Sequence, residues 1–371
     1  MQQTFFILFF LLLFSTVLFG GHFLLYLIVV KFFGITVFKV KILLLLLALI
    51  LSFSFVVSSS LAHIYENIFT KFLYFSSGIW LGFLLYFEII VGIILLFNFV
   101  FKKYSLNYKL SIYLALVLSI IFVGYGICYA FSPTVKNIEI KIKNLPVNWD
   151  GKKVVMISDV HLGHIYNADF MTKIVSQING LNPEAVFIVG DLFDGMDGNL
   201  DELVNPLNNL KSKKGVYYVT GNHETYLGVE KIASLLEKAG IKILNDEAVN
   251  IDGISLIGLS YPERGEFKDF KTVFDELNLD KTSPKILLYH SPVHLDQASN
   301  AGIDLQLSGH THRGQMFPFN FITQIVYAGH DYGLTNYQNL QIYTSNGVGT
   351  WGPTLRTFNR GEIVNIVLRK M

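Results

Sequence analysis

The stretch Val189-Gly190-Asp191-Leu192-Phe193-Asp194-Gly195 organises the second half of this chain. It ends an apolar run, 185–189, whose β-branched and aromatic residues do not alternate with polar ones. That pattern is typical of a buried strand in a parallel sheet. Gly190 lets the chain turn, and Asp191 is the first carboxylate after the strand. Sites in open α/β sheets collect where such strands end, so Asp191 could bridge two cations, although a strand ending in Gly-Asp more often only starts a turn.

Composition separates the chain into two parts. Of the 371 residues, 52% are hydrophobic and only 15% are charged, with a mean hydropathy of +0.46, whereas soluble proteins have about 25% charged residues. The deficit lies almost entirely before residue 132, which predicts a membrane region followed by a soluble domain. The formal net charge of +1 gives no bias toward nucleic acid, so we expect no nucleic-acid partner. Cys128 is the single cysteine, which excludes an internal disulfide or a cysteine-based metal site.

Four apolar runs are each long enough to cross a hydrocarbon core of about 30 Å as a helix. They cover 4–30, 42–61, 75–99 and 110–131. The first could be a cleaved signal peptide, but it is too long, lacks a basic start and is followed by three more runs. Glu88 lies in the third run, and a carboxylate in the hydrocarbon core costs free energy unless it faces the helix bundle or lies near the edge of the membrane. We therefore predict an all-α, multi-pass transmembrane region of about four helices over residues 1–132.

Lysines in the short loops predict the orientation. The loop after the first run contains Lys31, Lys39 and Lys41, the loop after the third contains Lys102, Lys103 and Lys109, and the loop after the second contains only Lys71. The positive-inside rule places the first and third loops in the cytoplasm. With four spans, everything after Phe131 then lies outside the cytoplasm. Lysines just after the last span argue against this placement, and one wrong span would reverse it.

The rest of the chain has an α/β pattern. Residues 133–151 read as a linker that becomes a strand, because 138–142 alternate apolar and polar residues. Residues 152–371 form the predicted soluble domain. Its expected strands are 154–157, 185–189, 216–219, 254–259, 286–289, 305–307, 342–344 and 363–368, and its expected helices are 168–181, 200–210, 229–239 and 267–277. Strands that alternate with helices predict parallel sheet.

Residues that can bind metal follow five of these strands. They are Asp159 and His161, then Asp191, then Asn222 and His223, then His290, and finally His310 and His312. Residues two apart in an extended chain point the same way, so each Asp-x-His or His-x-His pair can hold one cation. Taken singly, these motifs are more often turns, helix caps or core histidines. Five of them in order favour two divalent cations such as Mn, Fe or Zn.

The ensemble resembles a known family. Asp159-x-His161, Gly190-Asp191-x-x-Asp194, Gly221-Asn222-His223-Glu224, His290 and Gly309-His310-x-His312 look like the full motif set of the calcineurin-like metallophosphoesterases. The resemblance covers about residues 150–371. The sequences at 157–163 and 308–315 are most similar to the bacterial membrane-associated branch, which often has N-terminal transmembrane segments. The resemblance implies an α/β fold, a calcineurin-like β-sandwich flanked by helices.

The resemblance also implies roles for individual residues. Asp159, His161 and His312 would hold the first metal, Asn222, His290 and His310 the second, and Asp191 would bridge them. His223 would be the catalytic histidine near the leaving oxygen, and Asp194 would orient it. The nucleophile would be a water or hydroxide on the metal pair, without a covalent phosphoenzyme. Arg313 and Arg356 are candidates for substrate phosphate or for structural roles. His164 and Glu224 lie near the site in sequence, whereas we expect His294 and His330 to be structural or solvent-facing.

The expected function is that of a membrane-anchored dimetal phosphohydrolase that cleaves phosphodiester, phosphomonoester or pyrophosphate bonds. The anchor motivates the hypothesis of a lipid-linked phosphate substrate. The alternative is a catalytically silent membrane protein that binds metal or acts as a scaffold, which a degenerate motif set would favour. The helical region could also have a transporter-like function of its own. An anchor is the simpler interpretation, because the spans lack the paired charges that are typical of transporters.

Overall fold

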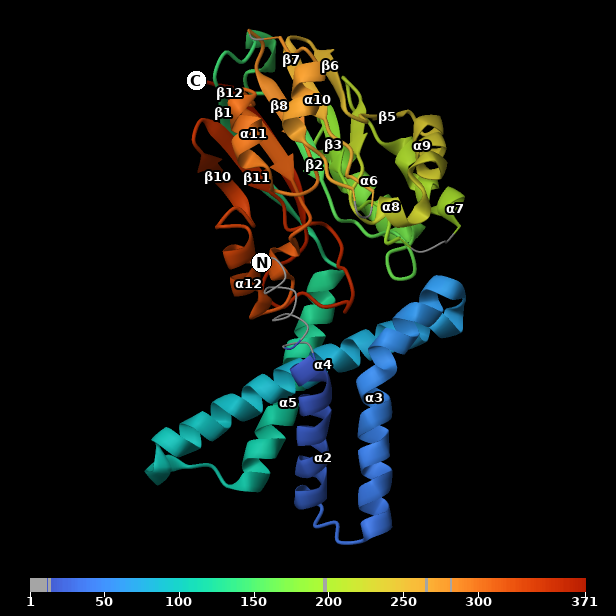
Figure 1. Ribbon diagram of the computed structural model, residues 1–371, viewed down its shortest axis with the longest axis vertical. Coiled ribbons are helices and arrows are strands. Elements are labelled where there is room, and N and C mark those ends of the chain that lie inside the picture. The colour runs from blue at the N-terminus through green and yellow to red at the C-terminus, as the bar shows by residue number, and fades with distance from the viewer. Residues whose placement is uncertain (1–11, 13–14, 196–198, 264–265, 281) are drawn as a thin grey trace. The chain divides into compact units, whose positions relative to one another are not determined.

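The computed structural model describes residues 12, 15–195, 199–263, 266–280 and 282–371 (Figure 1). The chain divides into a helical unit, Met1–Cys128 with Gly352–Leu355, and a sheet unit, Tyr129–Trp351 with Arg356–Met371.

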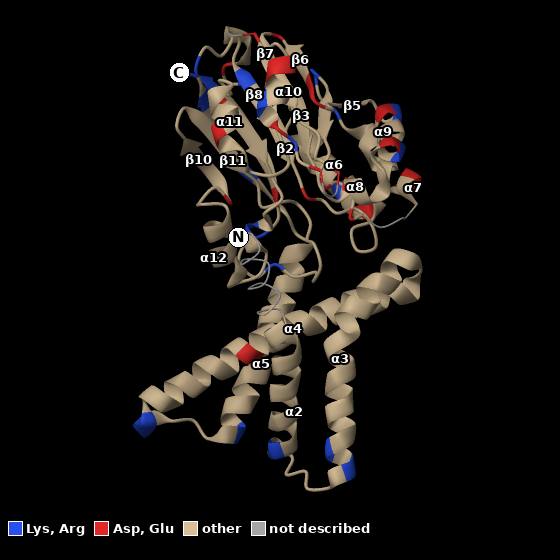
Figure 2. Ribbon diagram, viewed as in Figure 1, with Lys and Arg blue, Asp and Glu red and all other residues tan. Residues whose placement is uncertain are grey.

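In its described residues, the helical unit contains one short and three long apolar helices. They are α2 (Gly21–Phe32), α3 (Phe38–Ile64), α4 (Ile68–Val100) and α5 (Tyr108–Ala130), with a π-helical turn at Thr16–Gly20 and a 3-10 turn at Lys102–Tyr104. The helices α3, α4 and α5 are long and apolar enough to cross a membrane, whereas the first apolar helix, Leu18–Phe32, is shorter. The predicted run 4–30 lies partly outside the described residues. Figure 2 shows basic residues at the α2–α3 and α4–α5 connections.

Helix α4 starts seven residues before the predicted span 75–99. The reason is a capping box, in which the side chain of Asn67 accepts hydrogen bonds from the backbone N–H groups of Phe69 and Thr70 at 2.9 and 3.0 Å. Lys71 therefore lies in the first turn of the helix and not in the predicted loop. Glu88 faces α2, because a Cβ atom on Gly21 would overlap its carboxyl group.

The sheet unit contains two six-stranded sheets. The first has the order β1-β12-β2-β3-β4-β5, and the second has the order β10-β11-β9-β8-β7-β6. The bounds are β1 Thr134–Ile142, β2 Lys153–Ile157, β3 Ala185–Val189, β4 Val216–Val219, β5 Ile241–Ile243, β6 Glu247–Ile251, β7 Ile254–Gly258, β8 Lys285–Leu288, β9 Leu305–Ser308, β10 Gly333–Tyr337, β11 Leu340–Thr344 and β12 Glu362–Lys370. Strands β2 to β5 run parallel, as do β7, β8, β9 and β11.

Helices cover the outer faces of both sheets (Figure 1). The first sheet packs against α6 (Ala168–Gly180), α7 (Leu200–Val204) and α9 (Val229–Lys238), and the second packs against α10 (Phe270–Glu276) and α11 (Leu295–Asn300). The shorter elements are η3 (Val147–Trp149), η4 (Asn205–Asn209), α8 (Glu224–Leu227), η5 (His312–Gly314) and α12 (Phe319–Val326). These layers confirm the predicted α/β sandwich flanked by helices.

Burial on both faces explains the continuous apolar strands. Phe187 and Val189 of β3 lie in the core between the sheets, together with residues of β7, β8 and β9, whereas Val186 and Ile188 pack against the helices. Successive side chains of a strand point to opposite faces. Both sets must therefore be apolar, which is why the run 185–189 does not alternate.

The sequence-based assignment missed β5, β6 and β10, and each of them is an edge strand. Edge strands are paired on one side only, so their residues are partly exposed and carry a weak apolar pattern. The predicted helix 200–210 changes to a 3-10 helix at Asn205, because Pro206 has no N–H to donate and its ring clashes with the preceding turn.

Candidate metal centre

The predicted metal ligands meet at the edge of the sandwich where the parallel strands end. Among the described residues, three groups of three side chains each bring their ligand atoms within 4.8 Å of one another. One of them is His161, Asp194 and His223, and the other two consist entirely of predicted ligands of divalent cations. Of these two, the first group is Asp159, His161 and His312, and the second is Asp191, His290 and His310. The strands β2, β3, β8 and β9 position these residues, because each residue follows the carboxyl end of its strand within a few positions.

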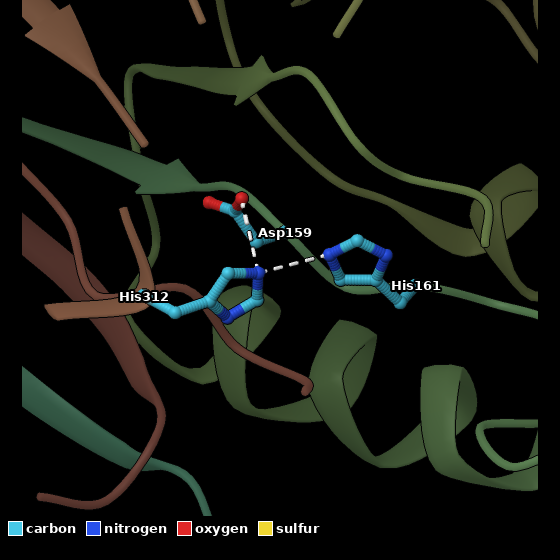
Figure 3. A group of neighbouring side chains, drawn as sticks. All are labelled: Asp159, His161 and His312. Atoms are coloured by element: carbon cyan, nitrogen blue, oxygen red, sulfur yellow. Dashed lines mark hydrogen bonds and ion pairs between the residues drawn. The ribbon is translucent and has the colours of Figure 1, made fainter. Parts of the chain in front are cut away.

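The first group is compact and buried (Figure 3). His161 Nε2 lies 3.0 Å from His312 Nε2, and His312 Nε2 lies 3.5 Å from Asp159 Oδ1. Two nitrogens that bind one cation at about 2.1 Å are separated by roughly 3.0–3.4 Å. The spacing of the two imidazoles therefore fits a shared metal ion.

Asp191 lies between the two groups. Its Oδ2 is 3.0 Å from His290 Nε2 and 3.9 Å from His161 Nε2. The backbone carbonyl of Val189 lies 2.9 Å from His290 Nδ1, which directs Nε2 of that ring toward the site. The amide oxygen of Asn222 is also buried, and among the described residues it has no hydrogen-bond partner. These donors fit a pair of divalent cations with Asp191 between them.

The surroundings of His223 differ in one respect from the predicted arrangement. His223 Nδ1 lies 2.9 Å from the backbone carbonyl of Asp194, whereas the Asp194 carboxylate is 3.9 Å from it. The same carboxylate is closer to His161, at 3.2 Å from Nδ1. Asp194 thus contacts His223 mainly through its backbone and His161 through its side chain.

Left-handed backbone conformations concentrate at the site. Five of the seven predicted ligands have positive φ angles, at values between 46° and 72°: Asp159, His161, Asp191, His310 and His312. Such conformations cost non-glycine residues about 1–3 kcal/mol and persist where surrounding contacts hold them. Here the backbone N–H of His310 donates to both oxygens of Asp159, at 3.0 and 3.1 Å. The backbone N–H of His223 similarly donates to Asp191 Oδ1 at 2.9 Å. The turns therefore hold the carboxylates in place.

Glu224 joins the loops that follow β3 and β4. Its buried carboxylate accepts hydrogen bonds from the backbone N–H groups of Asp191 and Phe193, both at 3.0 Å, and of Gly221, at 2.6 Å. Burial, and next the charge of Asp191, raises the pKa of Glu224 to about 7. In the sequence, Glu224 is near the site only because it follows His223 in the motif. No sequence signal predicted that its carboxylate would bind the loop after β3.

Arg356 is fully buried and does not face solvent. Its Nε donates to the carbonyl of Gly349 at 3.1 Å, and its Nη2 donates to the carbonyl of Asn346 at 2.7 Å. Nη2 is also 3.4 Å from His312 Nδ1. Arg313 is half-buried, with its guanidinium carbon 4.1 Å from the ring centre of Tyr332. These contacts favour the structural alternative for Arg356.

The three other histidines named from the sequence belong to none of the ligand groups among the described residues. His164 is buried, His330 Nδ1 lies 2.8 Å from the hydroxyl of Thr335, and the ring of His294 lies 4.6 Å from that of Phe270. The exposed rings of Tyr226 and Trp351 lie 5.5 and 6.1 Å from the ring of His223. The sequence motifs assigned neither of these two aromatic residues to the site.

Electrostatics prepare the histidines to act as ligands. Burial lowers the pKa of His310 to about 3 and also lowers the pKa of His161, so both rings are neutral at pH 7. Burial also opposes a charge on His290, but the carboxylate of Asp191 outweighs it and raises the pKa of His290 to about 10. A cation that binds His290 must therefore displace a proton.

We expect Gly309→Ala to weaken metal binding. A Cβ atom on Gly309 would overlap the Asp159 carboxylate and the side chain of Ser158, and there is no positive φ angle to add strain. Displacement of this carboxylate should lower metal affinity by about 10–100-fold and destabilise the fold by about 1–3 kcal/mol. Gly180→Ala is the matched control, because no atom lies within 4 Å of its added Cβ. Metal titration of both variants tests this prediction, and equal affinities would refute it.

Comparison with known proteins agrees with this geometry. The family model for calcineurin-like phosphoesterases matches residues 152–314. A metallophosphoesterase of Campylobacter jejuni subsp. jejuni is 35% identical over 279 residues, which are 72% of this chain and 72% of that protein. This chain belongs to the calcineurin-like metallophosphoesterase family. Membership confirms the predicted enzyme class, a metal-dependent phosphoesterase, and together with the two ligand groups it supports a site for two metal ions.

One further relative of this metallophosphoesterase and one solved structure come from Danio rerio. A transmembrane protein with metallophosphoesterase domain is 34% identical over 279 residues, 69% of this chain and 62% of that protein. The crystal structure of a dimetal phosphatase is 16% identical with a TM-score of 0.36, and it covers 53% of this chain and 88% of its own. The name of the first relative and the three long apolar helices support membrane association.

Proposed function

We propose that this metallophosphoesterase hydrolyses a phosphoester carried by a membrane lipid, using two divalent cations. The observation that carries the proposal is the position of Asp191, whose carboxylate oxygen is within 4 Å of a histidine from each ligand group. Asp159, His161 and His312 would hold one cation, and Asn222, His290 and His310 the other. Asp191 would be shared by both.

Each of the remaining site residues has a proposed task. The two cations supply Lewis-acid charge that activates water and neutralises the phosphoryl oxygens. His223 would give a proton to the leaving oxygen, because its ring lies 4.6 Å from that of His161 and its backbone N–H donates to Asp191, so it is beside both ligand groups. The carbonyl of Asp194, 2.9 Å from His223 Nδ1, would hold the proton on Nδ1 and leave Nε2 facing the substrate. The Asp194 side chain would support His161.

The ligand groups of the site limit which metal ions it can bind. Imidazole, carboxylate and amide groups suit Mn, Fe or Zn, and among the described residues no ligand group contains a cysteine that would select a softer ion. We propose manganese as the first metal to test.

The membrane region supports a lipid-linked substrate, and its lysines predict on which side of the membrane the catalytic domain lies. The proposed organisation is a membrane region to residue 132, a linker with the first strand at 133–151 and the enzyme domain at 152–371. Basic residues at the end of α2, at the start of α3 and in the α4–α5 connection would face the cytoplasm. The proposed four spans would then place the catalytic domain outside the cytoplasm.

Removal of metal should abolish hydrolysis, and addition of manganese should restore it. The full chain in detergent would be stripped with chelator, supplied with Mn²⁺ and assayed with bis-p-nitrophenyl phosphate and p-nitrophenyl phosphate. Restored activity supports the proposal, and the ratio of the two rates separates diesterase from monoesterase. Two bound ions without hydrolysis of either ester or of a phospholipid would instead support the silent scaffold. A folded chain that binds no metal would refute the dimetal site.

A further inference from the structure

Helix α12 (Phe319–Val326) presents an uncovered apolar face. None of its residues is buried, and Phe321, Ile325 and Val326 are 53%, 68% and 52% exposed. Phe321 and Ile325 are four residues apart, so they share one face of the helix. No Lys, Arg, Asp or Glu occurs in residues 314–329. An exposed helix of a soluble surface normally carries charge on its outer side, so this face is suited to an apolar environment.

This helix adjoins the metal centre. It follows η5 (His312–Gly314), which contains one of the predicted ligands. Tyr327, the residue directly after α12, has its ring 6.3 Å from the ring of His310. A molecule held against α12 is therefore close to the site.

The chain enters the sheet unit at the edge that carries the site. β12 is antiparallel to β2, and the pair Val364↔Met156 places the start of β12 beside the carboxyl end of β2, where the metal ligands begin. Thr134, the first residue of β1, pairs with Glu362 at the start of β12. The first strand therefore starts at the edge that carries the site.

The connection from α5 to this edge is short. Only residues 131–133 separate Ala130, the last residue of α5, from Thr134, a path of about 14 Å at most. Contacts within the sheet unit hold this end in place, because the Tyr166 hydroxyl donates to the carbonyl of Ala130 at 3.1 Å. The guanidinium of Arg360 lies 4.4 Å from the ring centre of Tyr129. Since α5 is long and apolar enough to cross a membrane, the chain passes from a candidate membrane span into the strand that starts at the site edge.

We propose that the exposed face of α12 lies in the surface of the lipid bilayer and presents the metal centre to phosphoesters of lipid headgroups. Such a helix inserts its apolar face about 5–10 Å into the boundary between headgroups and acyl chains. The exposed Trp351 and Arg360, which belong to the same sheet unit, are residue types enriched at this boundary. This inference rests on the proposed function for the substrate class, but the contact with lipid can be tested without hydrolysis.

The test measures lipid contact directly in the full chain. Ile325→Cys in a Cys128→Ser background would carry an environment-sensitive fluorophore, and the protein would be reconstituted into vesicles of phosphatidylcholine and phosphatidylglycerol with a lipid-attached nitroxide quencher. Val147→Cys is the matched control. Val147 is also an exposed apolar residue, at 77%, but it lies between the end of β1 and the start of β2, at the opposite edge of the first sheet.

We expect the label at 325 to lose most of its fluorescence to the lipid quencher and the label at 147 to lose almost none. Quenching at neither position, or equally at both, would overturn the proposal. Shielding of the label at 325 in detergent as the protein concentration rises would also overturn it, because a second copy would then cover the helix.

A kinetic comparison separates this inference from the proposed function. The double variant Phe321→Ser, Ile325→Ser should hydrolyse bis-p-nitrophenyl phosphate at the wild-type rate and lose most of its activity on phospholipid in vesicles. Equal loss on both esters would contradict the role of α12. Absence of hydrolysis by the wild-type chain would contradict the proposed function and leave the quenching result to decide the lipid contact.

Discussion

Asp191→Asn should lower kcat/KM for a phosphodiester by about 10³-fold or more, equivalent to about 4 kcal/mol of transition-state stabilisation. The carboxylate is buried between the two ligand groups, 3.0 Å from His290 Nε2 and 3.9 Å from His161 Nε2. An amide has almost the same shape but removes the negative charge that two cations would share. We therefore expect the variant to fold and to lose at least one of its two metal ions.

Two measurements check this result. Metal analysis of the purified chain gives the ion content, and thermal unfolding of the metal-free forms shows whether the fold is intact. Asp201→Asn is the control, because Asp201 is an exposed carboxylate in the first turn of α7. A variant of Asp191 with two bound ions and wild-type activity would exclude a bridging role.

His223→Gln should reduce hydrolysis of an alkyl phosphodiester by about 10²–10⁴-fold, the usual contribution of general acid catalysis. A p-nitrophenolate leaving group needs little protonation, so the loss with bis-p-nitrophenyl phosphate should be less than about tenfold. A residue that only maintains the fold or binds metal would reduce both rates alike. The dependence on leaving group therefore distinguishes proton donation from a structural role.

The pH profile provides a second test of His223. Burial, and next the neighbouring His161, lowers the pKa of His223. As the pH rises through this pKa, His223 loses the proton that it would donate. The wild-type rate on the alkyl ester should therefore fall in that pH range, and His223→Gln should not show this fall. His330→Gln is the control, because His330 lies outside the three groups of candidate metal ligands among the described residues. Similar losses in both histidine variants would argue against proton donation.

Much of the sheet unit could be predicted because its signals are local. The runs 185–189 and 216–219 were predicted with the bounds of β3 and β4, since a strand buried on both faces must be apolar throughout. The missed strands β5, β6 and β10 have weak local patterns because they are edges. The start of α4 depends on the Asn67 cap and not on hydropathy.

The sequence by itself determined which donors occur after each strand, that cysteine cannot contribute to the site, and that the apolar first third is separate from the α/β half. These properties depend on residue type and on spacing along the chain. The family resemblance implied which distant donors share a site, but residue type and spacing alone could not show it, and only the tertiary structure brings His161 and His312 together across 151 positions of sequence. It also decided that the Asp194 carboxylate approaches His161, that Glu224 joins two loops, and that the apolar side chains of Phe321, Ile325 and Val326 on α12 are exposed. These groups meet because distant segments pack together, and such packing produces no periodic pattern of residues from which it could be predicted.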